Sequence, residues 1–280
     1  MNREFEIIQR FLRSGKDAAH LNKSFQKIHD EQGIGHIMGS YIWFNARDRE
    51  GLRGWFKDRT GIDPLVESSI PEDRISVACV GINEKLARKN VFAGQLKVAA
   101  PIGYEVQTIN GPAITPRGTN LLVPSDHLIL EEAEVIIVEN GAVMRSINDL
   151  QFEQPFANPL FIYRGHESDA RELKIALAAY PPACVIGFYD FDPAGMLMGL
   201  ESKSDSLIFP KLSEENLEQS LLTKINQAEK FWTQAHQMSR LKTKAPETLL
   251  PFVEMMERLE LAIMQEHIVA HQMMLSRYDL

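Results

Sequence analysis

Residues 134–210 constrain the fold more than any other part of this chain, because strand-like and helix-like patterns alternate through them. Short apolar runs, rich in β-branched residues, cover residues 135–138, 159–163, 183–189 and 206–209. Segments with helical spacing cover residues 168–179 and 193–200. A strand that is apolar on both faces is typical of a parallel sheet covered by helices. We therefore predict an α/β fold with a parallel sheet in this region.

Acidic residues stand at the ends of two of these predicted strands. Glu139 follows the first run, and Asp190 and Asp192 follow the third, with Phe191 between them. In an open α/β sheet the carboxyl ends of the strands form one edge, where ligands bind. Side chains two residues apart in a strand point to the same side. We therefore expect these three carboxylates to lie close together.

Clustered carboxylates suit a divalent cation that acts on phosphate groups. Mg²⁺ takes few protein ligands and leaves positions for water and phosphate oxygens. After Asp192, Pro193 fits a first helical turn and Gly195 permits close approach to the sheet. We predict that Glu139, Asp190 and Asp192 hold Mg²⁺, with Glu139 also able to act as a general base. An Asp-x-Asp pair by itself is also found as a plain helix cap.

Residues 134–210 resemble a Toprim domain, whose pattern is a glutamate after the first strand and Asp-x-Asp after the third. The likeness rests on Val-Glu-Asn at residues 138–140 and Phe-Tyr-Asp-Phe-Asp-Pro-Ala-Gly at residues 188–195. Within that superfamily these segments are most similar to the JetD family of Wadjet (SMC-type) plasmid-defence nucleases and to topoisomerase VI A subunits. Residues 81–85 and 264–267 also resemble short JetD-family segments, and the latter makes Glu266 a further candidate ligand.

The resemblance implies a Mg²⁺- or Mn²⁺-dependent endodeoxyribonuclease. It also implies a homodimer that acts on double-stranded plasmid DNA together with an SMC-like ATPase, a kleisin and a winged-helix subunit. Topoisomerase VI cuts with a tyrosine from a run of adjacent tyrosines, and this chain has no such run. Tyr41 and Tyr104 are interpreted as packing residues, so hydrolysis is favoured. A non-catalytic Toprim adaptor, a topoisomerase VI A-like enzyme and an RNA-directed Toprim enzyme remain alternatives.

The rest of the chain predicts two flanking regions. Residues 1–130 combine helices, a strand near residues 37–44 and short β-prone runs after residue 95, which fits a winged-helix-like region with a β connector. Residues 131–210 form the predicted Toprim domain. Residues 211–280 have helical spacing throughout, so we expect a helical extension that packs on the Toprim domain.

Several charged residues are weaker candidates, each with a plainer explanation. Arg164 follows the second strand and either contacts a phosphate or balances the acidic edge. Glu266 is either a ligand or an exposed helical glutamate. Lys85, Arg88 and Lys89 form a basic group that either binds a DNA backbone or is a solvated helix face.

The distribution of charge bears on partners. The net charge is −8, and residues 131–205 alone hold 13 acidic and 5 basic groups. A protein that binds a polyanion unaided is usually basic along one face, so this segment requires bound cations or a basic partner. The first residues are acidic and lead into no long apolar run, so we expect no membrane segment and a cytoplasmic protein.

Overall fold

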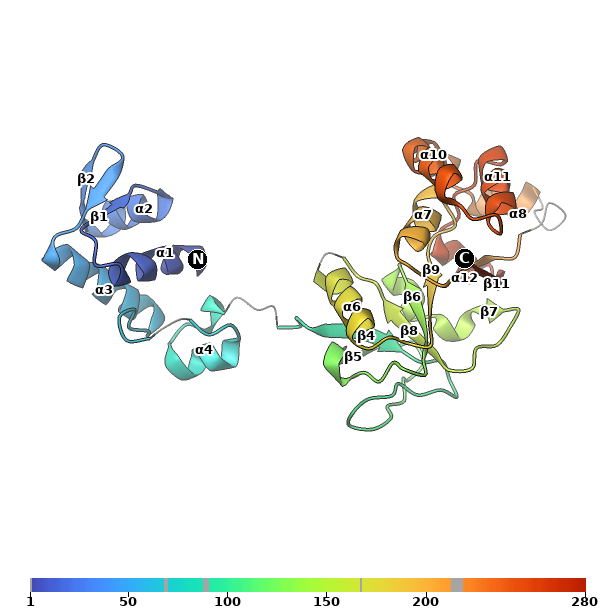
Figure 1. Ribbon diagram of the computed structural model, residues 1–280, viewed down its shortest axis with the longest axis horizontal. Coiled ribbons are helices and arrows are strands. Elements are labelled where there is room, and N and C mark those ends of the chain that lie inside the picture. Colours follow the sequence, from blue (N-terminus) through green and yellow to red (C-terminus); the bar gives the residue numbers. More distant parts are fainter. Residues whose placement is uncertain (1, 68–69, 88–90, 167, 213–218) are drawn as a thin grey trace. The chain divides into compact units, whose positions relative to one another are not determined.

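The computed structural model describes residues 2–67, 70–87, 91–166, 168–212 and 219–280. It divides into two compact units, Met1–Ala93 and Gly94–Leu280 (Figure 1). The division therefore falls earlier than the boundary predicted near residue 130. The reason is that residues 95–124 supply strands to the sheet of the second unit, so they are part of its core and not a connector.

The first unit is mostly helical. Its elements are α1 (Asn2–Arg13), β1 (Ala18–His20), α2 (Lys23–Gln32), β2 (His36–Met38), β3 (Tyr41–Trp43), α3 (Ala46–Thr60), α4 (Arg74–Val80) and η1 (Glu84–Leu86). The strands form an antiparallel sheet in the order β1-β3-β2. Asn45 caps α3 in a capping box, and Gly61 ends it with a left-handed backbone. The strand expected at residues 37–44 is a β2–β3 hairpin.

The described strands of the second unit form an eight-stranded sheet. They are β4 (Gln95–Ala99), β5 (Leu121–Pro124), β6 (Glu134–Val138), β7 (Gln151–Phe152), β8 (Pro159–Tyr163), β9 (Cys184–Phe188), β10 (Ser206–Pro210) and β11 (Met274–Asp279). Their order is β5-β4-β8-β6-β9-β10-β11-β7. The four central strands β8, β6, β9 and β10 are parallel, which confirms the α/β prediction for this region.

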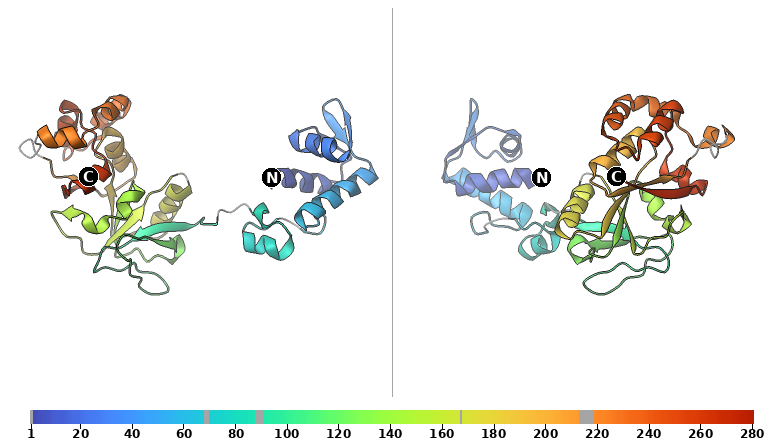
Figure 2. Two further views of the ribbon diagram at one scale, coloured as in Figure 1. Left: turned by 180° about the vertical axis from the view of Figure 1, so that it is seen from behind. Right: turned by 45° about the vertical axis from the view of Figure 1, so that its right-hand side comes forward.

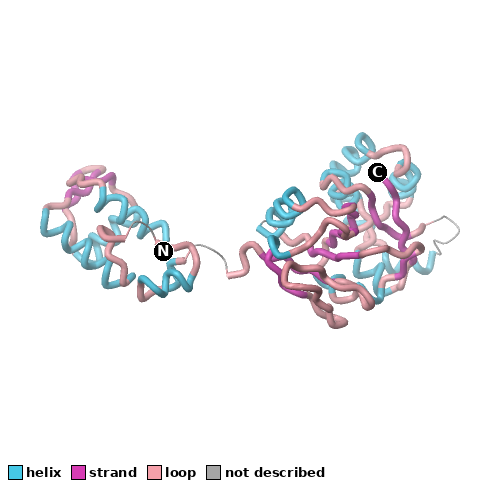
Figure 3. The backbone as a smooth tube through the Cα atoms, turned by 60° about the horizontal axis from the view of Figure 1, so that its bottom comes forward, coloured by secondary structure: helices cyan, strands magenta, loops and turns pink. Residues whose placement is uncertain are grey.

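Helices lie on either side of this sheet (Figure 3). They are α5 (Gly141–Met144), α6 (Ser168–Ala179), α7 (Pro193–Glu201), α8 (Gln219–Ile225), α9 (Ala228–Thr233), α10 (Ala235–Lys244), α11 (Leu250–Arg258) and α12 (Gln265–Ala270), with the short turns η2 (Ser125–His127) and η3 (Ile147–Asp149). Figure 2 shows α10 beside α7, the helix that follows β9. Residues 135–138 of β6 are all buried, so the apolar runs form the centre of the core.

The prediction of a purely helical C-terminal region is wrong at its end. Residues 274–279 form β11, which pairs antiparallel with β10 and parallel with β7. Tyr278 of β11 stacks on Phe209 of β10, with the ring centroids 4.0 Å apart. This pairing covers the edge of β10 that the parallel strands leave open. In the parts of the chain that the structure describes, no helix has the length and apolarity needed to cross a bilayer.

Candidate functional site

Glu139 and Asp190 lie side by side at the carboxyl edge of the parallel strands. Glu139 directly follows β6, and its backbone N–H donates to the carbonyl of Phe188, the last residue of β9, at 3.3 Å. The backbone N–H of Asp190 lies 3.4 Å from Glu139 Oε2. The neighbouring strands β6 and β9 therefore bring together residues that are far apart in the sequence.

Asp192 is buried and forms the N-cap of α7. Its side chain is 2 % exposed, and Oδ1 accepts a 2.7 Å hydrogen bond from the backbone N–H of Gly195. Oδ2 accepts a 2.9 Å hydrogen bond from Gln234 Nε2 on the linker into α10. The Gln234 Oε1 atom in turn accepts from the backbone N–H of Ala194 at 2.9 Å. The Asp192 carboxylate is thus held by the start of its own helix and by a residue far along the chain.

Lys230 of α9 places its ammonium between the two aspartates. Its Nζ atom is 3.1 Å from Asp190 Oδ2 and 3.0 Å from Asp192 Oδ2, and it lies 2.7 Å from Met264 Sδ. Burial lowers the pKa of Lys230, but hydrogen bonds and charge attraction from Asp192 and Asp190 outweigh it, so the pKa is raised. Sequence reasoning missed Lys230, since a single lysine in a predicted helix carries no signal of such contacts.

Gln265 fastens the start of α12 to the same edge. Its backbone N–H donates to Asp190 Oδ1 at 2.9 Å, and its Nε2 donates to the carbonyl of Phe188 at 2.9 Å. Its Oε1 accepts from the backbone N–H of Asn140 at 2.8 Å. The next residue, Glu266, is exposed and accepts a hydrogen bond from the Asn140 side chain. Residues 264–267, singled out by resemblance, therefore reach the site through Gln265, with Glu266 at its rim.

The carboxylates repel one another. Burial raises the pKa of Glu139, and the negative charges of Asp190 and Asp192 raise it further. Arg164, which follows β8, acts against this shift. The backbone N–H of Arg164 donates to the carbonyl of Val138 at 2.9 Å, so this arginine stands beside Glu139 on the same edge. The edge therefore holds three acidic groups, with Lys230 and Arg164 as nearby cations.

The donor set suits a cation in part. The Oδ2 atoms of Asp190 and Asp192 converge on one positive group, as oxygen ligands of Mg²⁺ would, and Mg²⁺ is often held by only one or two carboxylates together with water and phosphate. Within the described residues, however, no three His, Cys, Asp or Glu side chains are arranged to hold a metal ion. The place between the Oδ2 atoms of the two aspartates is taken by the Lys230 ammonium.

The other candidates lie elsewhere. Lys85 is exposed in η1 of the first unit, and Arg88 and Lys89 fall outside the described residues. Tyr41, expected to pack, is 47 % exposed on β3 because its side chain points away from the core of the first unit. Tyr104 packs as expected, and its hydroxyl donates to the carbonyl of Phe156 at 3.0 Å.

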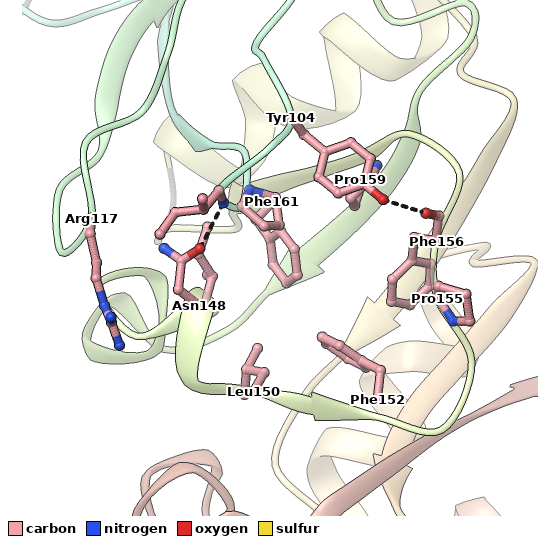
Figure 4. Close-up of a pocket in the computed structure, with 12 residues that line it drawn as sticks. Tyr104, Arg117, Asn148, Leu150, Phe152, Pro155, Phe156, Pro159 and Phe161 are labelled. Carbon is pink, nitrogen blue, oxygen red and sulfur yellow. Dashed lines mark hydrogen bonds between the residues drawn. The ribbon is translucent and has the colours of Figure 1, made fainter.

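An apolar pocket of about 360 Å³ lies at the opposite edge of the sheet. Figure 4 shows Leu150, Phe152, Phe156 and Phe161 around this hollow. Pro159 also lines it and is the first residue of β8, whereas the carboxylates follow the last residues of their strands. The pocket is therefore separate from the acidic edge.

Gly195 is required by the close approach of α7 to the end of β9. A Cβ atom at this position would lie 2.2 Å from the backbone oxygen of Asp190. We expect Gly195→Ala to lower the free energy of unfolding by about 1–3 kcal/mol, because backbone has to shift. Gly141→Ala in the same unit is the matched control, because its Cβ would come no closer than 3.6 Å to the Tyr163 ring, an ordinary contact. Urea denaturation should show the larger loss for Gly195→Ala, and equal losses would contradict this explanation.

Comparison with known proteins gives one family. A search of curated proteins finds no match. The sequence model of a family described as a domain of unknown function, DUF7281, matches residues 93–277. This range begins at the boundary between the two compact units and ends within β11, so it covers the eight-stranded sheet up to that point and the acidic edge. Because the match spans more than half of the chain, the protein belongs to the DUF7281 family.

Proposed function

We propose that the chain is a divalent-metal-dependent endonuclease of the Toprim type that hydrolyses phosphodiester bonds in double-stranded DNA. The observation that carries the proposal is the convergence of Asp190 and Asp192 on a single cationic group beside Glu139 at the ends of parallel strands. Such an edge is where open α/β sheets bind ligands. The residues are also those that carry the Toprim resemblance.

The chemistry divides between the metal and the side chains. When bound, Mg²⁺ or Mn²⁺ would polarise a phosphate oxygen and lower the pKa of a bound water. Asp190 and Asp192 would hold it, with Glu266 near enough to the edge to assist. Water would attack phosphorus and pass a proton to Glu139, while the bond to the leaving oxygen breaks and that oxygen takes up a proton from solvent. Glu139, whose pKa is raised by burial and by the aspartates, is suited to exchange the proton.

The setting is proposed from resemblance and charge. JetD-family nucleases act in SMC-type complexes, so the partners would be an SMC-like ATPase, a kleisin and a winged-helix subunit, with the chain as a cytoplasmic homodimer. Because residues 131–205 carry an excess of acidic groups, we expect the chain to bind DNA within a complex whose other subunits supply positive charge. We propose Arg164, which follows β8 beside Glu139, as the residue that contacts a phosphate at this edge.

Metal removal tests the proposal. Purified chain should nick or linearise supercoiled plasmid with Mn²⁺ or Mg²⁺, lose this activity in EDTA, and regain it when Mn²⁺ is restored in excess. A mock purification from cells without the chain is the control for contaminating nucleases. Single-stranded DNA and RNA of the same sequence should be cut more slowly. Cleavage that persists in EDTA, or no cleavage of any of these substrates by folded protein, contradicts the proposal.

The Lys230 contacts favour a second candidate, a non-catalytic adaptor. A lysine between the two aspartates neutralises part of the acidic edge without any metal, as a purely structural Toprim fold would require. An adaptor should dock partner subunits or DNA and show no carboxylate-dependent binding of Mn²⁺. Calorimetry with Mn²⁺ therefore separates the two candidates.

A further inference from the structure

We propose that Lys230 is a resident cation that competes with the divalent metal for Asp190 and Asp192, so that metal binds only when the lysine moves away. This inference rests on the metal site of the proposed function and adds a condition on its loading. It concerns a residue that neither the motif nor the resemblance singles out.

The geometry excludes joint occupancy. Lys230 Nζ lies 3.1 Å and 3.0 Å from the Oδ2 atoms of Asp190 and Asp192. A magnesium ion needs oxygen ligands at roughly 2.0–2.1 Å, so an ion shared by the same two atoms would take the space that the ammonium fills. The remaining oxygens are committed to backbone N–H groups, Asp190 Oδ1 to Gln265 and Asp192 Oδ1 to Gly195. The two Oδ2 atoms are therefore the ones for which lysine and metal compete, with Asp192 Oδ2 also accepting a hydrogen bond from Gln234 Nε2.

Lys230 is built to leave more easily than the other partners. Its side chain is 35 % exposed, whereas Gln234 and Gln265, which hold the same aspartates, are buried. It stands on α9, a six-residue helix with no side-chain N-cap and no buried residue. A lysine stem has several rotatable bonds and can carry its ammonium to water without opening the core. The aspartates, in contrast, keep their backbone and glutamine contacts when the lysine has gone.

Removing the ammonium should make the site bind metal more tightly. Lys230→Met keeps the apolar stem and removes the charge, so both aspartates are left without their shared cation. We expect Lys230→Met to bind Mn²⁺ about tenfold or more tightly than wild type in calorimetry without nucleic acid. Lys242→Met is the matched control, since Lys242 pairs with exposed Glu257 on the surface of α10 and α11. It should leave the affinity unchanged.

A second measurement guards against a variant that folds poorly. Lys230→Met should melt at a lower temperature than wild type without metal, and Mn²⁺ should raise its melting temperature by more than that of wild type. Adding Asp190→Asn to Lys230→Met should abolish both gains. Equal affinity and equal Mn²⁺-induced shifts in Lys230→Met and wild type overturn the inference, as does a gain that survives Asp190→Asn.

The outcomes distinguish this inference from the proposed function. If the chain cuts DNA with Mn²⁺ but its Mn²⁺ affinity does not change in Lys230→Met, the proposed nuclease activity stands and the proposed competition by Lys230 is wrong. If Lys230→Met binds Mn²⁺ more tightly than wild type, but neither protein cuts any nucleic acid, the proposed competition by Lys230 stands and the proposed nuclease activity is wrong.

Discussion

Replacing Asp192 with alanine is expected to lower the free energy of unfolding of the second unit by about 3–5 kcal/mol and to reduce cleavage to background. The Asp192 carboxylate is buried, accepts hydrogen bonds from Gly195 and Gln234, and forms an ion pair with Lys230. Alanine removes the α7 cap and leaves a partly buried ammonium and a buried amide without their shared acceptor.

The measurement requires a signal from the second unit alone. Trp232 on α9 lies beside the site in sequence, whereas the other tryptophans, Trp43 and Trp55, belong to the first unit. Since Trp232 is 57 % exposed, urea denaturation is better followed by the near-UV circular dichroism of the tyrosines, all of which except Tyr41 belong to the second unit, in a background where Trp43 and Trp55 are phenylalanine. A loss below about 1 kcal/mol, the usual cost of a helix cap alone, would show that the buried contacts contribute little.

Asp192→Asn is the matched control. Asparagine is a good N-cap and keeps an oxygen that can accept from the backbone N–H of Gly195. Its amide NH₂ group, however, would replace Oδ2 and face the donor groups of Gln234 and Lys230. We expect its stability to fall between those of wild type and Asp192→Ala. Since the negative charge is lost in both variants, cleavage should be at background in both. Wild-type cleavage by Asp192→Asn would remove Asp192 from the proposed metal site.

The parallel strands and the place of the carboxylates could be predicted because their signals are local. A continuous apolar run identifies a doubly covered strand, and an acidic residue directly after it has to lie at the carboxyl edge. Glu139 and Asp190 need only the order of adjacent strands to meet, and β6 and β9 are neighbours. The close approach at Gly195 followed from the same reasoning, because a proline and a glycine after Asp192 mark a helix that starts against the sheet.

The groups that hold the carboxylates could not be predicted, because they arrive through long-range contacts. Lys230 lies on α9, Gln234 on the linker into α10 and Gln265 on α12, and helical spacing in the sequence does not tell which distant residues these side chains contact. The β11 strand was missed for a related reason. Its residues alternate only weakly, and pairing with β10 fixes their conformation. The unit boundary was misplaced because the β4 and β5 runs resemble a connector until β8 is known to pair with β4.

Replacing Glu139 with glutamine is expected to change activity and stability in opposite directions. If Glu139 exchanges a proton in the reaction, its loss should lower the rate of metal-dependent cleavage by about 10²–10⁴-fold. The same change removes a negative charge that Asp190 and Asp192 repel. Functional sites often hold such unfavourable charges at a cost in stability.

The pH dependence gives the sign of the stability effect. Because the pKa of Glu139 is raised in the folded protein, its proton binding favours the native state at low pH, and this contribution is lost as pH rises through the folded pKa. At neutral pH the ionised glutamate therefore destabilises the fold. Without metal, Glu139→Gln should raise the melting temperature by about 2–4 °C, the shift that 1 kcal/mol gives in a unit of this size. The gain should shrink as pH falls toward the ordinary value of 4.5.

Glu153 supplies the control for this experiment, because its surroundings lower its pKa, whereas those of Glu139 raise the pKa of that residue. Hydrogen bonds from Lys211 and Ser276 lower the pKa of Glu153, so its ionised form stabilises the native state and Glu153→Gln should lower the melting temperature at neutral pH. Thermal unfolding of both variants between about pH 5 and pH 8 therefore gives shifts of opposite direction. If Glu139→Gln instead melts below wild type at neutral pH, the Glu139 carboxylate is held by favourable contacts, and the repulsion that suits it to proton exchange is absent.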